Sequence, residues 1–262
     1  MPEQLPCPHL YAGHDAGHYS LPGDVLKARE TYRSLEAMPW PKPPQNAWET
    51  VQAVAVATVD ALHDGTKLPD IALIEQARQA ERVYADALDM MDLCFSTAVQ
   101  RARDTLRGQA LAIITDHLRP AHDATWQAYT DAHRVLLEHG ETEPRRLLSA
   151  PSKVRKASDT CDLMANRYEA ISAARSDLAM RCGLRSTDDP TGKYAAIRNY
   201  HELHPTRWAT AKPAWHGLPA RRYLDWMADH GGQLWMPTPD EQTEAALAEL
   251  HIGNPLGQRT AA

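Results

Sequence analysis

Long hydrophobic runs, paired cysteines and strand patterns are all missing from this 262-residue sequence. No apolar run approaches the roughly 18 residues that span a membrane, and the N-terminal segment lacks the basic start and apolar middle of a signal peptide. The four cysteines are widely spread without a CxxC pair, which is typical of reduced thiols. We therefore expect a cytoplasmic protein without a membrane partner.

Recognisable catalytic motifs are also missing. The sequence contains no P-loop, GxGxxG, GxSxG or HExxH motif and no Glu-x-x-His pattern of a di-iron helical bundle. These absences nominate no enzyme, and we expect a non-enzymatic function. An all-helical enzyme with an unrecognised site stays open as an alternative.

The charge balance is mildly acidic. A formal net charge of −6 argues against a general polyanion binder, because wholesale neutralisation of phosphates needs a basic surface. Arginine outnumbers lysine by 21 to 7 and alanine is abundant, a balance typical of a GC-rich bacterial or phage genome. If a phage encodes the chain, we expect it to be associated with the virion.

What the sequence does contain is an unusually long apolar stripe between Ile71 and His139. Its members step by 3, 4 and 4 residues, an eleven-residue repeat that stays on one face of a nearly straight helix. At about 1.5 Å per residue such a helix is roughly 100 Å long. Pro120 lies inside it, where we expect a kink, and Gly140 ends it. The stripe consists of Ala77, Ala80, Tyr84, Leu88, Met91, Phe95, Val99, Ala102, Leu106, Ala110, Ile113, His117, Ala121, Ala124, Ala128, Ala132 and Val135.

Shorter helices are predicted on both sides of this long helix. Residues 24–38 form one, Asn46 caps a second that ends at Gly65, and Ser152 begins a return helix to about Cys182. The second and the return helix, about 28 and 46 Å long, cannot cover a helix of roughly 100 Å. We expect about 25 Å around Phe95 to Leu106 to need another cover, either the C-terminal region or a second copy of the chain.

These patterns together predict an all-α fold. We expect an elongated antiparallel helical hairpin or open bundle built on one very long helix, with a small Trp-rich helical region at the C-terminal end. The expected divisions are a flexible Pro/Gly/His-rich segment over 1–23, the hairpin or bundle over 24–183, and short helices with a tail over 184–262.

A second stripe follows the distal part of the long helix on a different face. A helix with two apolar faces is covered on both, so the stripe is interpreted either as a docking surface for a partner or as a face covered by another part of the chain. It consists of His122, Trp126, Tyr129, His133 and Leu137.

Two further clusters are candidate binding sites. Basic residues crowd the tip of the predicted hairpin and could contact nucleic-acid phosphates, although such residues also serve to neutralise helix ends. Near the N-terminus, one cysteine and three histidines lie within twelve residues, a donor set suited to zinc, but their spacing matches no zinc module. The basic tip comprises Arg145, Arg146, Lys153, Arg155 and Lys156, and the metal candidates are Cys7, His9, His14 and His18.

The function predicted from these features is structural. We expect an assembly or interaction protein that works through helix-helix contacts, as a homo-oligomer or with another helical protein, in a setting such as a phage or prophage particle. A nucleic-acid-binding protein that uses the basic tip is the second hypothesis. No cofactor is expected, zinc being the only candidate.

Overall fold

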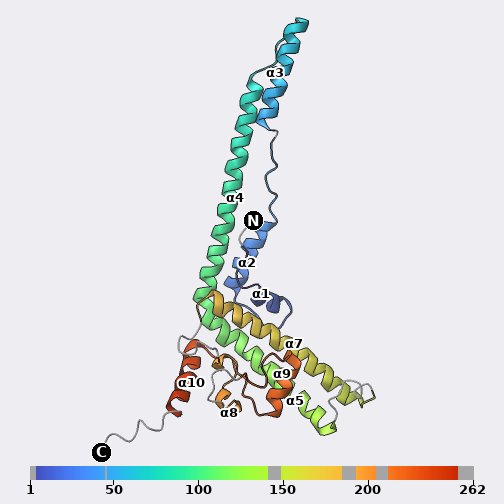
Figure 1. Cartoon of the computed structure of the whole chain (residues 1–262), viewed down its shortest axis with the longest axis vertical. Helices are drawn as coiled ribbons and strands as arrows, with labels where there is room; N and C mark the ends of the chain where they lie inside the picture. Colours follow the sequence, from blue (N-terminus) through green and yellow to red (C-terminus); the bar gives the residue numbers. More distant parts are fainter. Residues whose placement is uncertain (1–3, 45, 141–148, 185–192, 205–211, 253–262) are drawn as a thin grey trace, which may run out of the picture. The chain divides into compact units, whose positions relative to one another are not determined.

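The chain is all-α, as predicted. The computed structural model describes residues 4–44, 46–140, 149–184, 193–204 and 212–252, in which helices are joined by loops and one isolated β-bridge pairs Ile197 with Leu234. Among these residues, no helix is both long and apolar enough to cross a membrane. The helices are α1 (Pro8–Asp15), α2 (Gly23–Glu36), α3 (Ala47–Asp64), α4 (Ala72–Ala112), the π-helix η1 (Ile113–Leu118), α5 (Arg119–His139), α7 (Ser152–Arg181), the 3₁₀ helix η2 (Lys193–Ala195), α8 (Tyr200–Leu203), α9 (Ala220–Asp229) and α10 (Pro239–Ile252) (Figure 1).

The chain divides into two compact units, which are not the predicted ones. Unit 1 comprises Met1–Leu5 and Lys27–Ala102, and unit 2 comprises Pro6–Leu26 and Arg103–Ala262. The segment expected to be flexible therefore contributes to a compact unit, and the expected boundary at 183 and 184 is not observed. Each unit has its own hydrophobic core.

The core of unit 1 lies between α2 and the stretch of α4 from Met91 to Val99. Phe95 is 2% exposed; Tyr32 meets its ring edge-on at 5.7 Å and Trp40 stacks on it at 5.9 Å. Met91, Val99 and Leu35 complete the cluster. The helix around Phe95 thus has the additional cover that it was predicted to need, but the predicted source is wrong, because α2 and the proline-rich segment after it supply the cover instead of the C-terminal region or a second copy.

The ends of the long helices follow from local signals, as predicted. Asn46 caps α3 by accepting a hydrogen bond from the N–H of Trp48 at 2.8 Å, and Asp70 accepts one from the N–H of Ala72 at 2.9 Å. Gly65 and Gly140 end α3 and α5 with φ angles of 62° and 68°, a left-handed conformation that glycine adopts without steric cost.

The π-helix η1 changes which side of the long helix is buried. Pro120 has no N–H to donate, and the N–H of Arg119 reaches back five residues to the carbonyl of Ile114. The wider turn advances the buried register by one position. The predicted stripe is accordingly buried from Met91 to Ile113. After Ile113 only Ala132 of the predicted stripe is buried, and the other buried positions are Ile114, Leu118, His122, Thr125, Tyr129, His133 and Leu136.

Helices α5 and α7 of unit 2 form the predicted antiparallel pair. The ring of His122 lies 5.5 Å from that of Tyr168, and the thiol of Cys161 donates to the carbonyl of Tyr129 at 3.9 Å. Along α5 the contact moves from His122 to Tyr129, while along α7 it moves back from Tyr168 to Cys161, so the two helices run antiparallel. Helix α9 packs on both helices and closes the core with Leu224 and Met227.

The N-terminal part of unit 2 is a helix packed on α7. The peptide N–H of His9 donates to Oδ2 of Asp177 at 2.8 Å, and the hydroxyl of Tyr19 donates to the carbonyl of Leu10 at 2.7 Å. Leu10 is fully buried. The expectation of an extended or mobile segment over residues 1–23 missed these apolar anchors.

Candidate functional site

The feature of unit 1 that most requires an explanation is α3. Its 18 residues include Glu49, Asp60 and Asp64 but no lysine or arginine, and most of the remaining residues are alanine, valine or other apolar types. The apolar faces of a helix are normally covered by neighbouring elements.

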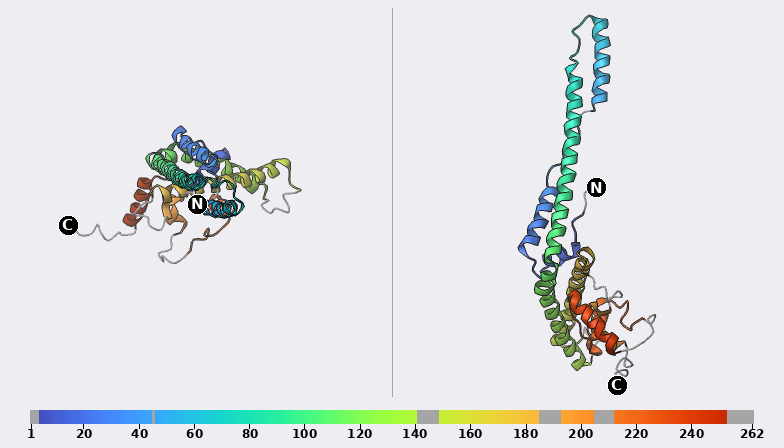
Figure 2. Two further views of the ribbon diagram at one scale, coloured as in Figure 1. Left: turned by 90° about the horizontal axis from the view of Figure 1, so that it is seen from above. Right: turned by 90° about the vertical axis from the view of Figure 1, so that its left-hand side faces the viewer.

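Helix α4 covers only one line of α3. The buried residues of α3 are Ala47, Val54 and Ala61, spaced by seven residues, so they lie on one narrow face. The start of α4 runs beside α3 (Figures 1 and 2), and the N–H of Ala47 donates to Oε1 of Glu81 at 2.7 Å. No described residue of α4 before Met91 is fully buried, so the two helices pack only loosely.

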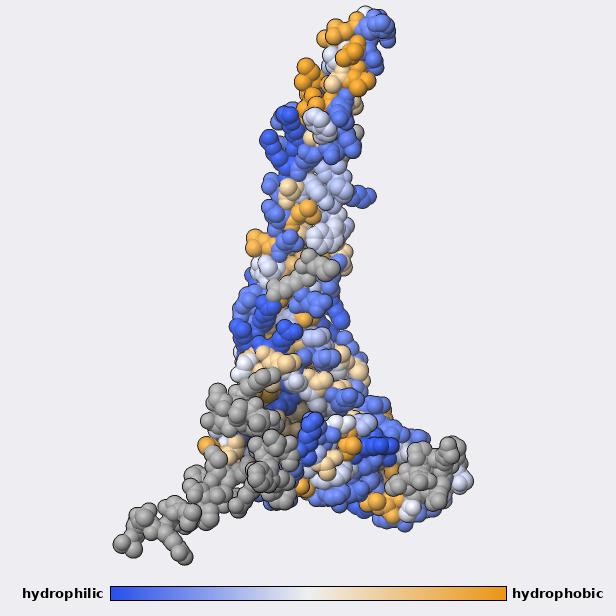
Figure 3. All heavy atoms as spheres, viewed as in Figure 1, coloured by the Kyte–Doolittle hydropathy of each residue, from blue (hydrophilic) through white to orange (hydrophobic). Residues whose placement is uncertain are grey.

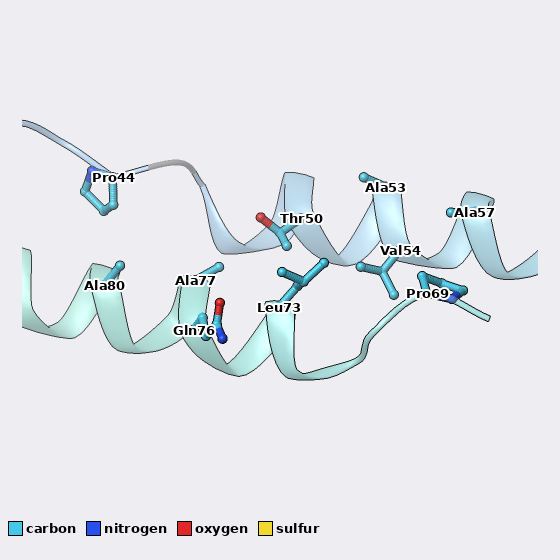
Figure 4. Close-up of a pocket in the computed structure, with 10 residues that line it drawn as sticks. All are labelled: Pro44, Thr50, Ala53, Val54, Ala57, Pro69, Leu73, Gln76, Ala77 and Ala80. Carbon is cyan, nitrogen blue, oxygen red and sulfur yellow. The ribbon is translucent and has the colours of Figure 1, made fainter. Parts of the chain in front are cut away.

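Loose packing leaves a groove between the two helices (Figure 4). Its volume is about 550 Å³, and side chains from both helices point into it. Small and apolar residues predominate in its lining, with Thr50 and Gln76 as the polar members. A groove with alanine walls is the kind of hole into which a larger side chain of another helix can insert. The apolar lining residues are Pro44, Ala53, Val54, Ala57, Pro69, Leu73, Ala77 and Ala80.

Large apolar side chains are also exposed elsewhere on the α3–α4 hairpin. Val59 and Leu62 are 66% and 70% exposed, and Ile71 at the start of the following helix is 73% exposed. Orange hydrophobic atoms gather over this part of the molecule in the space-filling view (Figure 3). We call this set the hairpin face; it consists of Trp48, Val56, Val59, Leu62, Leu68, Ile71, Leu73 and Val83.

The sequence assigned the docking role to a different set, and the structure places most of that set inside unit 2. His122, Tyr129 and His133 are between 0 and 3% exposed, and Trp126 is partly buried in the same core. Leu137, at 50%, is the exposed member. Helices α7 and α9 cover the stripe. The interpretation as a face covered by another part of the chain therefore fits, and the interpretation as an open docking surface does not.

His133 is held there by two carboxylates of α9. Its Nε2 lies 2.8 Å from Oδ1 of Asp229 and its Nδ1 lies 3.1 Å from Oδ1 of Asp225. The hydrogen bond with Asp225 raises the pKa of His133 above its usual value against the effect of burial, and Asp229 adds to the rise. Burial would raise the pKa of Asp225, but hydrogen bonds from His133 and Tyr129 lower it. The side chain of His133 therefore joins α5 to α9.

This arrangement predicts a pH-dependent stability. Because the pKa of His133 is raised in the folded protein, its contribution is complete below the unfolded value of about 6.5 and is lost as pH rises through the folded value. We expect His133→Gln to lower the free energy of unfolding by about 1–3 kcal/mol at weakly acidic pH, and by less at alkaline pH. Urea unfolding of both proteins across this range measures the difference; a difference that does not change with pH contradicts the assignment.

The other predicted clusters are not gathered into sites. Lys153, Arg155 and Lys156 are exposed in the first turns of α7, and Arg145 and Arg146 lie outside the described residues. Among the residues that the structure describes, no three His, Cys, Asp or Glu side chains could hold a metal ion together. Of the zinc candidates, Cys7 is buried before α1, His9 is exposed, and His14 and His18 are half-buried.

A second cavity, of about 590 Å³, lies in unit 2 between α5, α8 and α10. It has the acids and a histidine that an enzyme site would need, including Glu244 and His201. Two of its charges attach α10: Arg119 pairs with Glu241 and donates through Nε to the carbonyl of Met236 at 2.9 Å. Arg119 and Glu241 thus have a structural role.

Comparison of the chain with models of protein families, with curated proteins and with solved structures gives no match. Sequence analysis predicted the helix that Asn46 caps and considered it only as a partial cover of the long helix. The signal that identifies the hairpin face is the scarcity of charge along α3, which carries three acidic residues and no lysine or arginine.

Proposed function

We propose that this protein is a non-enzymatic assembly protein that works through helix-helix contacts of its α3–α4 hairpin. The observation that carries the proposal is the cover of α3, which is buried along a single line while large apolar side chains such as Val59 and Leu62 stay exposed elsewhere on it. The arginine-rich, alanine-rich composition leads us to favour a phage or prophage particle as the setting.

The energies involved favour a second copy of the chain as the partner. Complete burial of a valine or leucine side chain contributes about 1.5–3 kcal/mol, so the exposed two thirds of Val56, Val59 and Leu62 amount to about 3–6 kcal/mol. Association itself costs about 4–15 kcal/mol. In a two-fold symmetric pair each patch contributes twice, and the rest of the hairpin face adds to the sum. Self-association, which buries the patches of both copies, therefore offsets the free-energy cost of association. Burial of one patch alone does not.

The groove and the hairpin face are also complementary in size. Alanines such as Ala53, Ala57 and Ala77 line the groove, whereas leucine and isoleucine side chains stand exposed beside it. Large residues of one copy can fill the groove of the other, as knobs fill holes in packed helices.

Sedimentation equilibrium of the purified chain tests this proposal. We expect the mass to be a multiple of 29.2 kDa at micromolar concentration and to fall toward 29.2 kDa on dilution. A mass of one chain at every concentration would remove the basis for self-association and leave only a partner of another sequence.

Nucleic-acid binding at the basic tip is the second candidate, favoured by the exposure of Lys153, Arg155 and Lys156. The first turn of α7 carries no acidic residue, and positive side chains are unfavourable at a helix N-terminus unless they serve another purpose. Replacing the three by glutamine should weaken binding to short duplexes or single strands about tenfold or more and reduce its dependence on salt. If the unchanged chain binds neither, or binds equally at all salt concentrations, this candidate is excluded.

A further inference from the structure

Two cysteines that are far apart in the sequence meet where α1 packs on α7. Cys7 lies directly before α1 and is fully buried, and Cys182 directly follows α7. The hydrogen bond from the N–H of His9 to Asp177 fixes α1 against the last turns of α7. Both cysteines therefore lie where α1 meets the end of α7, close enough for each thiol to shift the pKa of the other.

The backbone of Cys7 is itself unusual. Its φ and ψ angles are 55° and 58°, and among the described residues it is the one non-glycine with a positive φ. A side chain makes this left-handed conformation unfavourable, and such residues persist where the surrounding structure holds them, often at functional positions. Here the conformation places the thiol at the junction of α1 and α7.

The two thiols differ in access and in acidity. Cys182 is half-buried, whereas Cys7 is fully buried. The hydrogen bond from Cys7 lowers the pKa of Cys182 despite partial burial, and the guanidinium of Arg107 adds to this effect. The same hydrogen bond and burial raise the pKa of Cys7. Because the thiolate is the nucleophile in thiol chemistry, Cys182 is the first to react.

We propose that Cys7 and Cys182 form a reversible disulfide between α1 and α7 by exchange with a small-molecule disulfide such as oxidised glutathione. The thiolate of Cys182 attacks one glutathione sulfur; a mixed disulfide forms and one glutathione thiolate leaves. Cys7 then loses its proton to solvent and attacks the sulfur of Cys182, which releases the second glutathione. The two protein sulfurs are oxidised, the two glutathione sulfurs are reduced, and the thiolates released take up the two protons.

The disulfide would tie the start of unit 2 to a helix more than 170 residues later in the sequence. A crosslink that closes so long a loop restricts the unfolded chain strongly. Oxidation should therefore raise the melting temperature of unit 2 by several degrees and slow proteolysis between α1 and α2.

Peptide mapping of the intact, folded chain tests the proposal. After treatment with oxidised glutathione we expect a single linked peptide pair containing Cys7 and Cys182, a mass lower by two hydrogens, and full reversal by dithiothreitol. The double variant Cys94→Ser, Cys161→Ser should behave in the same way, because neither residue belongs to the pair.

The outcomes that contradict the proposal are equally distinct. Glutathione that stays attached to Cys182, a link that involves Cys94 or Cys161, or no reaction at the pair would each overturn it. The wild-type chain supplies all of these results, so they do not depend on whether Cys7→Ser folds. They are also independent of whether the hairpin face self-associates.

Discussion

Replacing Val59 and Leu62 together by lysine is expected to convert the assembled protein into monomers. Both side chains are about two thirds exposed in the single chain, so the substitutions should leave the stability of the monomer within about 0.5 kcal/mol. In the assembly, the variant loses the burial of two apolar side chains in each copy and must desolvate two ammonium groups there. We expect the dissociation constant to rise at least about 100-fold, measured by sedimentation equilibrium.

Leu163 of α7 provides the matched control. It is 60% exposed but belongs to unit 2 and lies outside the hairpin face. Leu163→Lys should leave both the mass in solution and the melting temperature unchanged. If Leu163→Lys dissociates the protein as far as the double variant does, the hairpin face is not the contact surface.

The largest loss of stability is expected from Phe95→Ala. Phe95 is 2% exposed and lies between Tyr32 and Trp40 in the core of unit 1. Truncation of a buried phenylalanine costs about 3–5 kcal/mol, because the transfer energy is lost and a cavity remains. The small size of this core leaves few neighbours to fill the cavity. Urea unfolding followed by circular dichroism measures the change in the free energy of unfolding.

Leu93 lies two residues earlier on the same helix and is 66% exposed. Leu93→Ala is therefore expected to change the free energy of unfolding by less than about 0.5 kcal/mol. Similar losses in Phe95→Ala and Leu93→Ala would mean that α2 does not cover α4 as described. The comparison thus tests the correction that the structure makes to the uncovered middle of the long helix.

The predictable part of the fold depended on local chemistry. Asn46, Asp70 and Gly140 determine helix ends through hydrogen bonds and backbone conformations that involve only a few neighbouring residues. The return helix was equally predictable, because α7 begins at Ser152 and ends at Arg181, one residue before the predicted end. Patterns of this kind need no knowledge of distant contacts.

Errors arose where one position changes the register of many. The spacing of alanines continues through Pro120, so the sequence predicts one unbroken stripe, but η1 advances the register and buries Tyr129 in place of Ala128. Whether a helix accommodates proline by a kink, an end or a π-turn depends on packing around it. The apolar character of the second stripe was therefore predicted correctly. Its cover by α9 could not be predicted, because it is a contact between segments far apart in the sequence.

The candidate site was missed for a related reason. The lengths of the helices predicted that the part from Phe95 to Leu106 lacks a cover from α3 and α7, but they did not show which segment covers it. That depends on the packing of Tyr32 and Trp40 against Phe95, which joins segments far apart in the sequence. With the middle covered, the exposed apolar surface belongs to α3 and the start of α4.

Hydroxyl-radical footprinting at two protein concentrations tests the central claim, because it measures the exposure of individual side chains in solution. If the hairpin face is buried by a second copy, oxidation of Val59, Leu62 and Ile71 should fall several-fold at high concentration relative to dilute protein, while oxidation of Leu163 stays the same. Equal oxidation of the hairpin face at both concentrations, with a mass of one chain, would contradict assembly through α3 and α4.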